Sequence, residues 1–114
     1  MGGEEMKVKP MLPTLREKKR YLAFEAVSDH KNDFGSVEHA IMQSTAECLG
    51  TIDLAKAGVM LMADRWDSEK QRGIIRVNHK YVDKLKFSLA KIKGKVIFRS
   101  LAVSGILAKA SKAC

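Results

Sequence analysis

The pattern of large and small residues first becomes regular near position 20. Between Arg20 and Ser28 the run Tyr-Leu-Ala-Phe-Glu-Ala-Val alternates in the manner of a half-buried strand, and turn-forming residues follow it. Small or apolar residues then recur at helical spacing at positions 37, 40, 41, 44 and 48. Ser36 is placed to cap this helix and Gly50 to end it. The pattern therefore predicts a strand followed by a helix.

The next part of the chain has a strand–loop–strand pattern. Residues from about 58 to 66 predict a second strand, the polar run 67–73 a loop, and the β-branched run 74–78 a third strand, so that the two strands form a hairpin. A narrow apolar stripe then predicts a second helix, and its members are Val82, Leu85, Leu89 and Ile92. Residues 96–102 predict a fourth strand, and residues 106–112 predict a short final helix.

The order of these elements predicts the fold. A βαββαβ order of the mixed α/β (α+β) class places two helices on one face of a four-stranded antiparallel sheet. We therefore expect an RNA-recognition-motif-like or ferredoxin-like sandwich with an extra C-terminal helix. Residues 1–19 contain both prolines and little periodicity, and we expect an N-terminal arm there. Residues 20–114 are expected to form a single domain.

The distribution of charge points to a nucleic-acid partner. The formal net charge is +8 at pH 7, and from Lys70 to the end there are twelve Lys or Arg residues but a single acid, Asp83. This imbalance favours binding to a phosphate backbone, because Lys and Arg release counterions from the phosphates. The alternative, a basic surface that serves solubility alone, is less favoured. The longest apolar stretch, residues 57–63, is far shorter than the roughly 18 residues of a membrane span. We expect a cytoplasmic protein without membrane contact.

The sequence contains no recognisable catalytic pattern. The histidines, at positions 30, 39 and 79, lack the spacing of metal ligands, and the cysteines, at 48 and 114, form no Cys-x-x-Cys pair. Three acids surround the predicted hairpin loop, namely Asp64, Asp67 and Glu69. Acids in such loops are usually solvated turn formers, and Mg²⁺ binding is the less favoured alternative. We expect no catalytic residue, no metal site and no cofactor bound by this chain.

Two basic groups are candidates for RNA contact. On the second predicted helix, three lysines fall within roughly 40° of one another, opposite the apolar stripe, with Phe87 beside them; they are Lys80, Lys84 and Lys91. The lysines would contact phosphates, while Phe87 would stack on a base or anchor a protein partner. A solvated lysine face with an incidental Phe is an equally good interpretation. The second group lies where the arm meets the first strand, and it consists of Lys18, Lys19 and Arg20.

The open face of the predicted sheet is a poorer platform for bases. If Leu22 and Phe24 face the helices, Tyr21 is the only residue of the first and third strands that can stack on a base from the other face. Glu25 would repel a phosphate strand, or would pair with Arg76 across the ladder. Protein contact, or cover by the last helix, suits this face better.

Three segments in register resemble a known family. They are residues 13–25 (PTLREKKRYLAFE), residues 73–78 (GIIRVN) with 81–83 (YVD), and residues 99–105 (RSLAVSG). In this order and spacing they resemble the archaeal ribonuclease P protein component 2 family. That family is related to a eukaryotic subunit shared by ribonuclease P and the mitochondrial-RNA-processing ribonuclease.

The resemblance implies a subunit that supports the catalytic RNA of ribonuclease P in tRNA processing, the removal of 5′ leaders from precursor tRNA. Chemistry would belong to that RNA and its Mg²⁺ ions. The implied partners are the ribonuclease P RNA, protein component 3 in a possible heterotetramer, other ribonuclease P proteins, and precursor tRNA through the complex. Carried over by position, the candidate RNA contacts are Arg76, Arg99 and the cluster Arg16, Lys18, Lys19 and Arg20.

Two other functions compete with this one. A freestanding RNA-recognition-motif-like protein would bind single-stranded RNA through its sheet, and would depend on Tyr21. An independent enzyme ranks last, because no catalytic constellation is present in the sequence.

Overall fold

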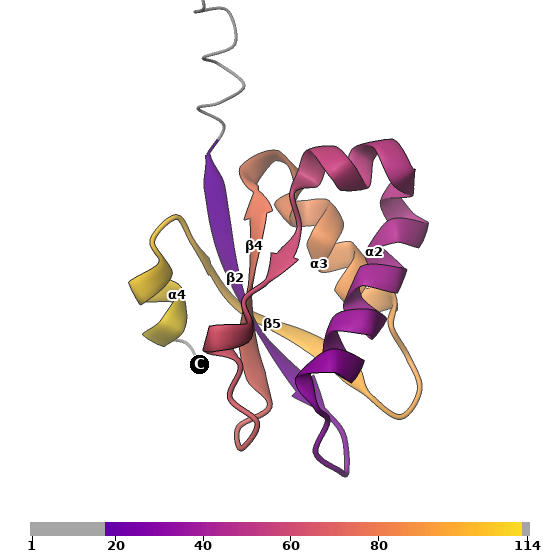
Figure 1. Ribbon diagram of the computed structural model, residues 1–114, viewed down its shortest axis with the longest axis vertical. Helices are drawn as coiled ribbons and strands as arrows, with labels where there is room; N and C mark the ends of the chain where they lie inside the picture. The colour runs from indigo at the N-terminus through magenta and orange to yellow at the C-terminus, as the bar shows by residue number, and fades with distance from the viewer. Residues whose placement is uncertain (1–17, 113–114) are drawn as a thin grey trace, which may run out of the picture.

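A four-stranded antiparallel sheet forms the centre of the computed structural model, which describes residues 18–112 (Figure 1). The strands are β2 (Lys19–Val27), β3 (Met60–Leu61), β4 (Arg72–Asn78) and β5 (Ile97–Ser104), in the order β3-β4-β2-β5. The helices are α2 (Phe34–Ala57), α3 (Val82–Lys91) and α4 (Leu107–Lys112), with two short 3-10 turns, η1 (Ala63–Arg65) and η2 (His79–Tyr81). The predicted βαββαβ order with an extra helix is confirmed.

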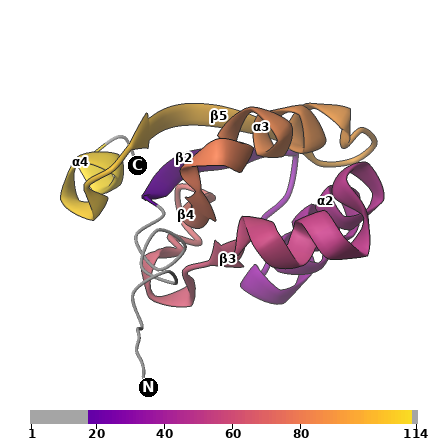
Figure 2. The same ribbon diagram turned by 90° about the horizontal axis from the view of Figure 1, so that it is seen from above.

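The helices lie on both faces of the sheet. Figure 2 shows α2 and α3 on one side of the strands and α4 on the other. Leu22 and Phe24 of β2 are buried toward α2 and α3, as predicted, together with Ile75 and Val77 of β4. Burial of this apolar surface is the main force that holds the two layers together.

The opposite face is also covered at its centre. Ala23 of β2 and Ile74 of β4 are register partners on this face, and both are fully buried. The short helix α4 packs against β2 and β5, and its Ala110 is likewise fully buried. The expectation that the last helix covers the open face is therefore confirmed.

The helix α2 is longer than predicted. It begins at Phe34 after Asp33, so the prediction that Ser36 caps it is wrong; the Ser36 hydroxyl donates a hydrogen bond to the Asp33 carboxylate at 2.6 Å. Gly50 breaks the helical geometry, with φ 81° and ψ 169°, but a further helical segment continues to Ala57. The prediction that Gly50 ends the helix is therefore wrong: Gly50 only interrupts it, because the fully buried Ala57 holds the second segment against the core.

The second strand is much shorter than the predicted range of 58–66. Within this range only Met60–Leu61 forms a strand on β4, and the chain then turns through η1. This turn brings the Trp66 ring to the edge of the core, with its centroid 6.1 Å from that of Phe24 and 6.4 Å from that of Phe34. Aromatic packing at Trp66 thus replaces continued strand pairing.

The glycine at position 73 should be essential for this aromatic packing. A Cβ atom at Gly73 would lie 3.0 Å from the Trp66 ring and 3.1 Å from the Phe24 ring. We expect Gly73→Ala to lower the free energy of unfolding by about 1–3 kcal/mol, because both rings are packed and would have to shift. Chemical denaturation measures the change.

Gly105→Ala is the matched control for this substitution. A Cβ atom there would meet only the flexible end of the Arg20 side chain, at 3.1 Å. We expect a change within about 0.5 kcal/mol. Equal stability of the Gly73→Ala variant and the unaltered protein would contradict the account of the Trp66 packing.

Candidate nucleic-acid interface

The pairing of β2 with β4 brings two predicted basic groups together. Lys19 is the register partner of Asn78, and the Lys18 carbonyl accepts a hydrogen bond from the His79 N–H at 2.9 Å. Since η2 begins at His79 and leads directly into α3, the junction with the predicted arm and the start of α3 lie at the same end of the sheet (Figure 1). The two groups, separate in the sequence, share one region of the surface.

A buried asparagine fixes the turn at this end. Asn78 is only 1% exposed, and its side-chain oxygen accepts a hydrogen bond from the Lys80 N–H at 3.0 Å. This bond caps η2, so Lys80 belongs to a 3-10 turn and was wrongly predicted to lie on the helix. The side chain of Lys80 is exposed.

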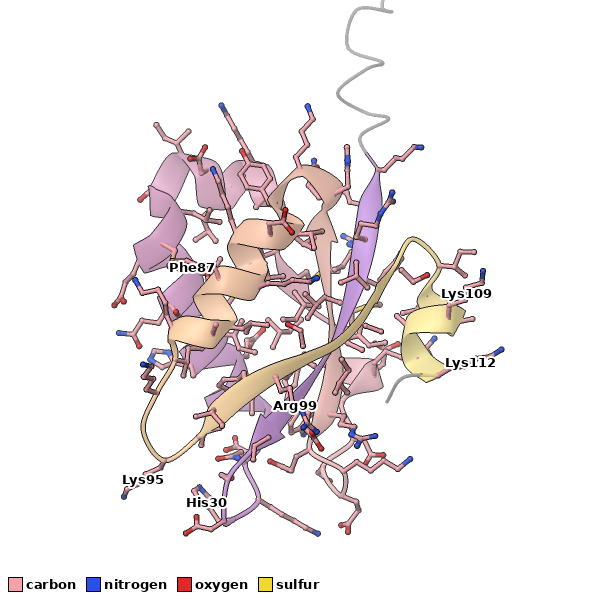
Figure 3. All side chains as sticks on the ribbon, turned by 180° about the vertical axis from the view of Figure 1, so that it is seen from behind. His30, Phe87, Lys95, Arg99, Lys109 and Lys112 are labelled. Atoms are coloured by element: carbon pink, nitrogen blue, oxygen red, sulfur yellow. The ribbon has the colours of Figure 1, made fainter. Side chains whose placement is uncertain are left out.

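The outer face of α3 carries lysines next to aromatic rings. The Lys84 ammonium lies 5.6 Å from the centroid of the Tyr81 ring, and the Lys91 ammonium lies 5.8 Å from that of Phe87. Phe87 is 62% exposed (Figure 3). An ammonium group has three N–H donors and a ring face does not use all of them, so these lysines can still contact phosphates. The predicted apolar stripe lies on the other side of the helix, where Leu85 and Leu89 are buried.

The remaining candidates lie elsewhere. Arg76 is half-buried on the α4 face, opposite Tyr21 and Met60. Arg99 is exposed and lies toward the other end of the sheet (Figure 3). Arg16 lies outside the described residues, as does most of the predicted arm. The structure therefore groups Lys18, Lys19, Lys80 and Lys84 at one end, and α3 carries Phe87 and Lys91 from there along the sheet toward its other end (Figure 3). Arg20 lies between the first end and the α4 face, next to Gly105.

Glu25 pairs with two arginines, neither of which is the predicted Arg76. Arg72 is its register partner and donates from Nε at 3.2 Å, while Arg99 donates to the other carboxylate oxygen from the neighbouring strand. Arg76 lies four residues farther along β4, opposite Tyr21, so the predicted pair is wrong by four register positions. Burial alone would raise the pKa of Glu25, but the hydrogen bonds and charges of Arg99 and Arg72 lower it overall.

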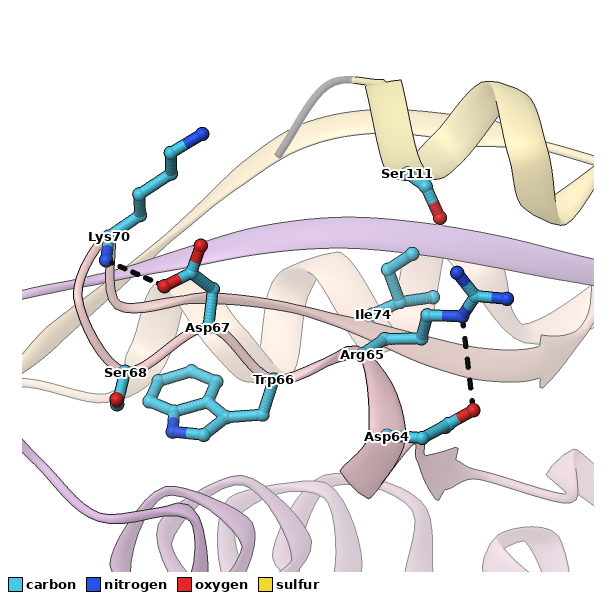
Figure 4. Close-up of a pocket in the computed structure, with 8 residues that line it drawn as sticks. All are labelled: Asp64, Arg65, Trp66, Asp67, Ser68, Lys70, Ile74 and Ser111. Atoms are coloured by element: carbon cyan, nitrogen blue, oxygen red, sulfur yellow. Dashed lines mark hydrogen bonds and ion pairs between the residues drawn. The ribbon is translucent and has the colours of Figure 1, made fainter.

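The acids of the hairpin loop stabilise local structure. Two of them, Asp64 and Asp67, border a hollow of about 530 Å³ between η1, the loop and α4 (Figure 4). The Asp67 carboxylate accepts hydrogen bonds from the N–H groups of Glu69 and Lys70, at 2.9 and 3.1 Å, and is a turn former, as predicted. The Glu69 carboxylate pairs with Lys31 at 2.8 Å. Within residues 18–112, no group of three His, Cys, Asp or Glu side chains is arranged to hold a metal ion.

Sequence patterns alone missed several contributors to these surfaces. Tyr81 supports the Lys84 ammonium, and a spacing of i, i+3 is a signal that could have found this pair. Arg72 could have been found by counting one position along the β2–β4 register from the pair of Phe24 and Gly73. Cys48 and Leu49 of α2, which line a cleft next to Phe87, depend on how the two helices pack and have no local signal.

The fold and the basic end of the sheet define a small RNA-recognition-motif-like α/β protein with a cationic helix surface. Residues 20–114 match the sequence model of the Rpp14/Pop5 family, and the chain belongs to that family. None of the helices in the described range is both long enough and apolar enough to cross a membrane.

Curated relatives extend over nearly the whole chain. Ribonuclease P protein component 2 of Thermococcus gammatolerans is 40% identical and covers 89% of this chain and 86% of its own length. The proteins of the same name from Pyrococcus abyssi and Methanosarcina mazei are 35% and 32% identical, and the matches cover 94% and 92% of this chain and 92% and 90% of those proteins. The predicted resemblance to this family is confirmed.

A solved structure supports the fold independently. A chain in the cryo-EM structure of yeast ribonuclease MRP superimposes with a TM-score of 0.59 at 16% identity, over 78% of this chain and 75% of that chain. At this identity the likeness shows the fold alone.

The ion pairs of Glu25 should make stability depend on pH. Because the folded state lowers the pKa of Glu25 below its usual 4.5, the pairs stabilise the fold above that pH and lose their effect as the pH falls through the lowered pKa. We expect the unaltered protein to melt at a higher temperature than Glu25→Gln at pH 6, and this difference to shrink toward pH 3. Thermal melts across this range, followed by circular dichroism, provide the test; a difference independent of pH would contradict it.

Proposed function

We propose that this chain is a protein subunit of ribonuclease P that supports the catalytic RNA in removing 5′ leaders from precursor tRNA. The observation that carries the proposal is the match to relatives named ribonuclease P protein component 2, which spans at least 86% of the relatives described above. Membership of the Rpp14/Pop5 family over residues 20–114 agrees with it.

The basic end of the sheet supplies the RNA contact in this proposal. Lys18, Lys19, Lys80, Lys84 and Lys91, here named the α3 basic surface, are exposed. The first three belong to segments that meet beside η2, and the last two lie along α3. Lysines bind phosphates as flexible point charges, which suits contact with an RNA backbone without sequence preference. Bond cleavage belongs to the RNA and its Mg²⁺ ions, and this chain positions or stabilises that RNA in the cytoplasm.

Protein partners would occupy other parts of the surface. The register partners Val27 and Ile97 are both more than one third exposed at one end of the sheet, and Met60 and Ile106 are exposed apolar residues elsewhere. Exposed apolar side chains of this kind are typical of surfaces that other proteins cover. We propose protein component 3 as one such partner, together with other ribonuclease P proteins.

The alternative of a freestanding single-strand binder is not favoured. An RNA-recognition motif that grips single strands displays bases on its central strands. Here α4 covers the centre of that face, Ala23 and Ile74 are fully buried, and Tyr21 is half-buried opposite Arg76. The sheet does not offer an open stacking platform.

Reconstitution tests the proposed function directly. We expect a holoenzyme assembled from the cognate RNA and all its proteins to cleave precursor tRNA at limiting Mg²⁺, and omission of this protein to lower the rate. The physical reason is that phosphate neutralisation by the protein replaces part of the counterion charge that compact RNA needs. An unchanged cleavage rate without the protein would refute the proposal.

The α3 basic surface should determine the salt dependence of RNA binding. We expect the double variant Lys84→Ala/Lys91→Ala to bind the ribonuclease P RNA more weakly. We also expect it to reduce the slope of log K against log salt by about 0.7–0.9 for each phosphate that a lysine no longer neutralises. Filter binding between roughly 50 and 400 mM KCl measures both quantities.

The matched control removes two lysines elsewhere. Lys86→Ala/Lys95→Ala makes the same change in net charge at exposed positions, one on the flank of α3 and one in the loop before β5. We expect this control to bind with nearly the original salt slope. An equal reduction of affinity in the two double variants would show that only total charge matters.

A further inference from the structure

A cleft beside the α3 basic surface has the chemistry of a nucleobase site. It lies between α2 and α3 and has a volume of about 430 Å³, within the range of roughly 300–1,000 Å³ that is typical of small-ligand sites. Its lining residues are Glu47, Cys48, Leu49, Asp83, Lys84, Phe87 and Lys91. Aromatic, apolar, cationic and anionic groups therefore meet in one place.

The exposed ring of Phe87 is the central feature of this cleft. A phenylalanine that is 62% exposed leaves much of its apolar area in water, an arrangement that a stacked partner would relieve. Cys48 and Leu49 lie half-buried on the α2 side and provide an apolar wall. A flat, apolar object can thus be covered from two sides.

The charges around the ring indicate what kind of flat object fits. Lys84 precedes Phe87 by three residues and Lys91 follows it by four, so that the two ammonium groups lie on the same face of α3, one turn on either side. This arrangement is complementary to an aromatic group that is flanked on both sides by an anion. A nucleotide within an RNA strand has this form, whereas an apolar protein side chain does not.

The two acids of the cleft fit the same ligand. The carboxylates of Glu47 and Asp83 can accept hydrogen bonds from N–H groups at the edge of a base. A base in a duplex has its faces stacked and its pairing edge occupied, so only an unpaired base can use the ring and the carboxylates together.

We propose that the cleft between α2 and α3 binds a single unpaired RNA nucleobase, which stacks on Phe87 while Lys84 and Lys91 contact the flanking phosphates. The inference rests on the proposed RNA-binding function and deepens it, because it assigns a base-recognising element to a surface otherwise suited to backbone contact. A bulged or looped nucleotide of the RNA is the expected ligand.

Two RNA hairpins that differ at one nucleotide test the proposal. One carries 2-aminopurine as a single-nucleotide bulge, and the other carries it paired within the stem; both have a 3′-fluorescein. We expect the full-length protein to bind the bulged hairpin at least about fivefold more tightly than the paired one, since stacking of a base on an aromatic side chain contributes about this much or more. We also expect quenching of the bulged 2-aminopurine on binding.

Substitutions at Phe87 separate stacking from charge. We expect Phe87→Ala to bind both hairpins with the lower affinity that the unaltered protein has for the paired hairpin, and to abolish the quenching. We expect Phe87→Trp to retain the preference for the bulged hairpin. Ile52→Ala is the matched control, because Ile52 is an exposed apolar residue, 72% accessible, that does not line the cleft; it should behave like the unaltered protein. Circular dichroism melts verify that each variant is folded.

The outcomes distinguish this inference from the function on which it rests. Equal, salt-sensitive binding of both hairpins would overturn the base site and leave backbone binding intact. If Phe87→Ala weakens binding of a partner protein but leaves the preference for the bulged hairpin unchanged, the cleft is a protein-docking site and the inference is wrong. Failure to bind either hairpin or the ribonuclease P RNA would overturn the inference and refute direct RNA binding by this chain.

Discussion

The antiparallel pairing of β2 with β4 determines where the main charged surfaces of residues 18–112 lie. Its register runs from Lys19 opposite Asn78 to Glu25 opposite Arg72. A shift by one residue would turn the buried side chains of β2 to the wrong face, so the core fixes this register strongly. At one end the pairing brings the first described residues beside η2 and α3, and at the other it places Glu25 among arginines.

Burial of β2 on both faces explains why the sheet is not the binding surface. Leu22 and Phe24 pack under α2 and α3, while the small Ala23 on the reverse face admits close packing of α4. A helix of only six residues has little stability of its own, and it depends on contacts such as the fully buried Ala110. Cover of the central strands leaves the outer face of α3 and the ends of the sheet for partners.

Sequence patterns predicted the elements that have a strong local period. The alternation in β2 and the stripe of Leu85 and Leu89 on α3 were sufficient to predict these two elements, because each pattern is set by burial on one face. The helical segment after Gly50 and the turn at Trp66 were missed, since both depend on packing against distant residues. The candidate surface shows the same division: the lysine face of α3 follows from helical spacing, but its proximity to Lys18 follows only from strand register.

Electrostatics distinguishes the arginines around Glu25 from the lysines along α3. Glu25 is shared by Arg72 and Arg99, so part of that positive charge is neutralised within the fold, and contact with a phosphate there would compete with an existing ion pair. The ammonium groups of Lys84 and Lys91 lie over aromatic rings, which hold a cation without neutralising its charge. A polyanion therefore gains more from the α3 basic surface than from these two arginines of the sheet, although Arg99 was also a candidate in the sequence. The same rings that position the lysines include the exposed Phe87, so charge and stacking become available to RNA at one place.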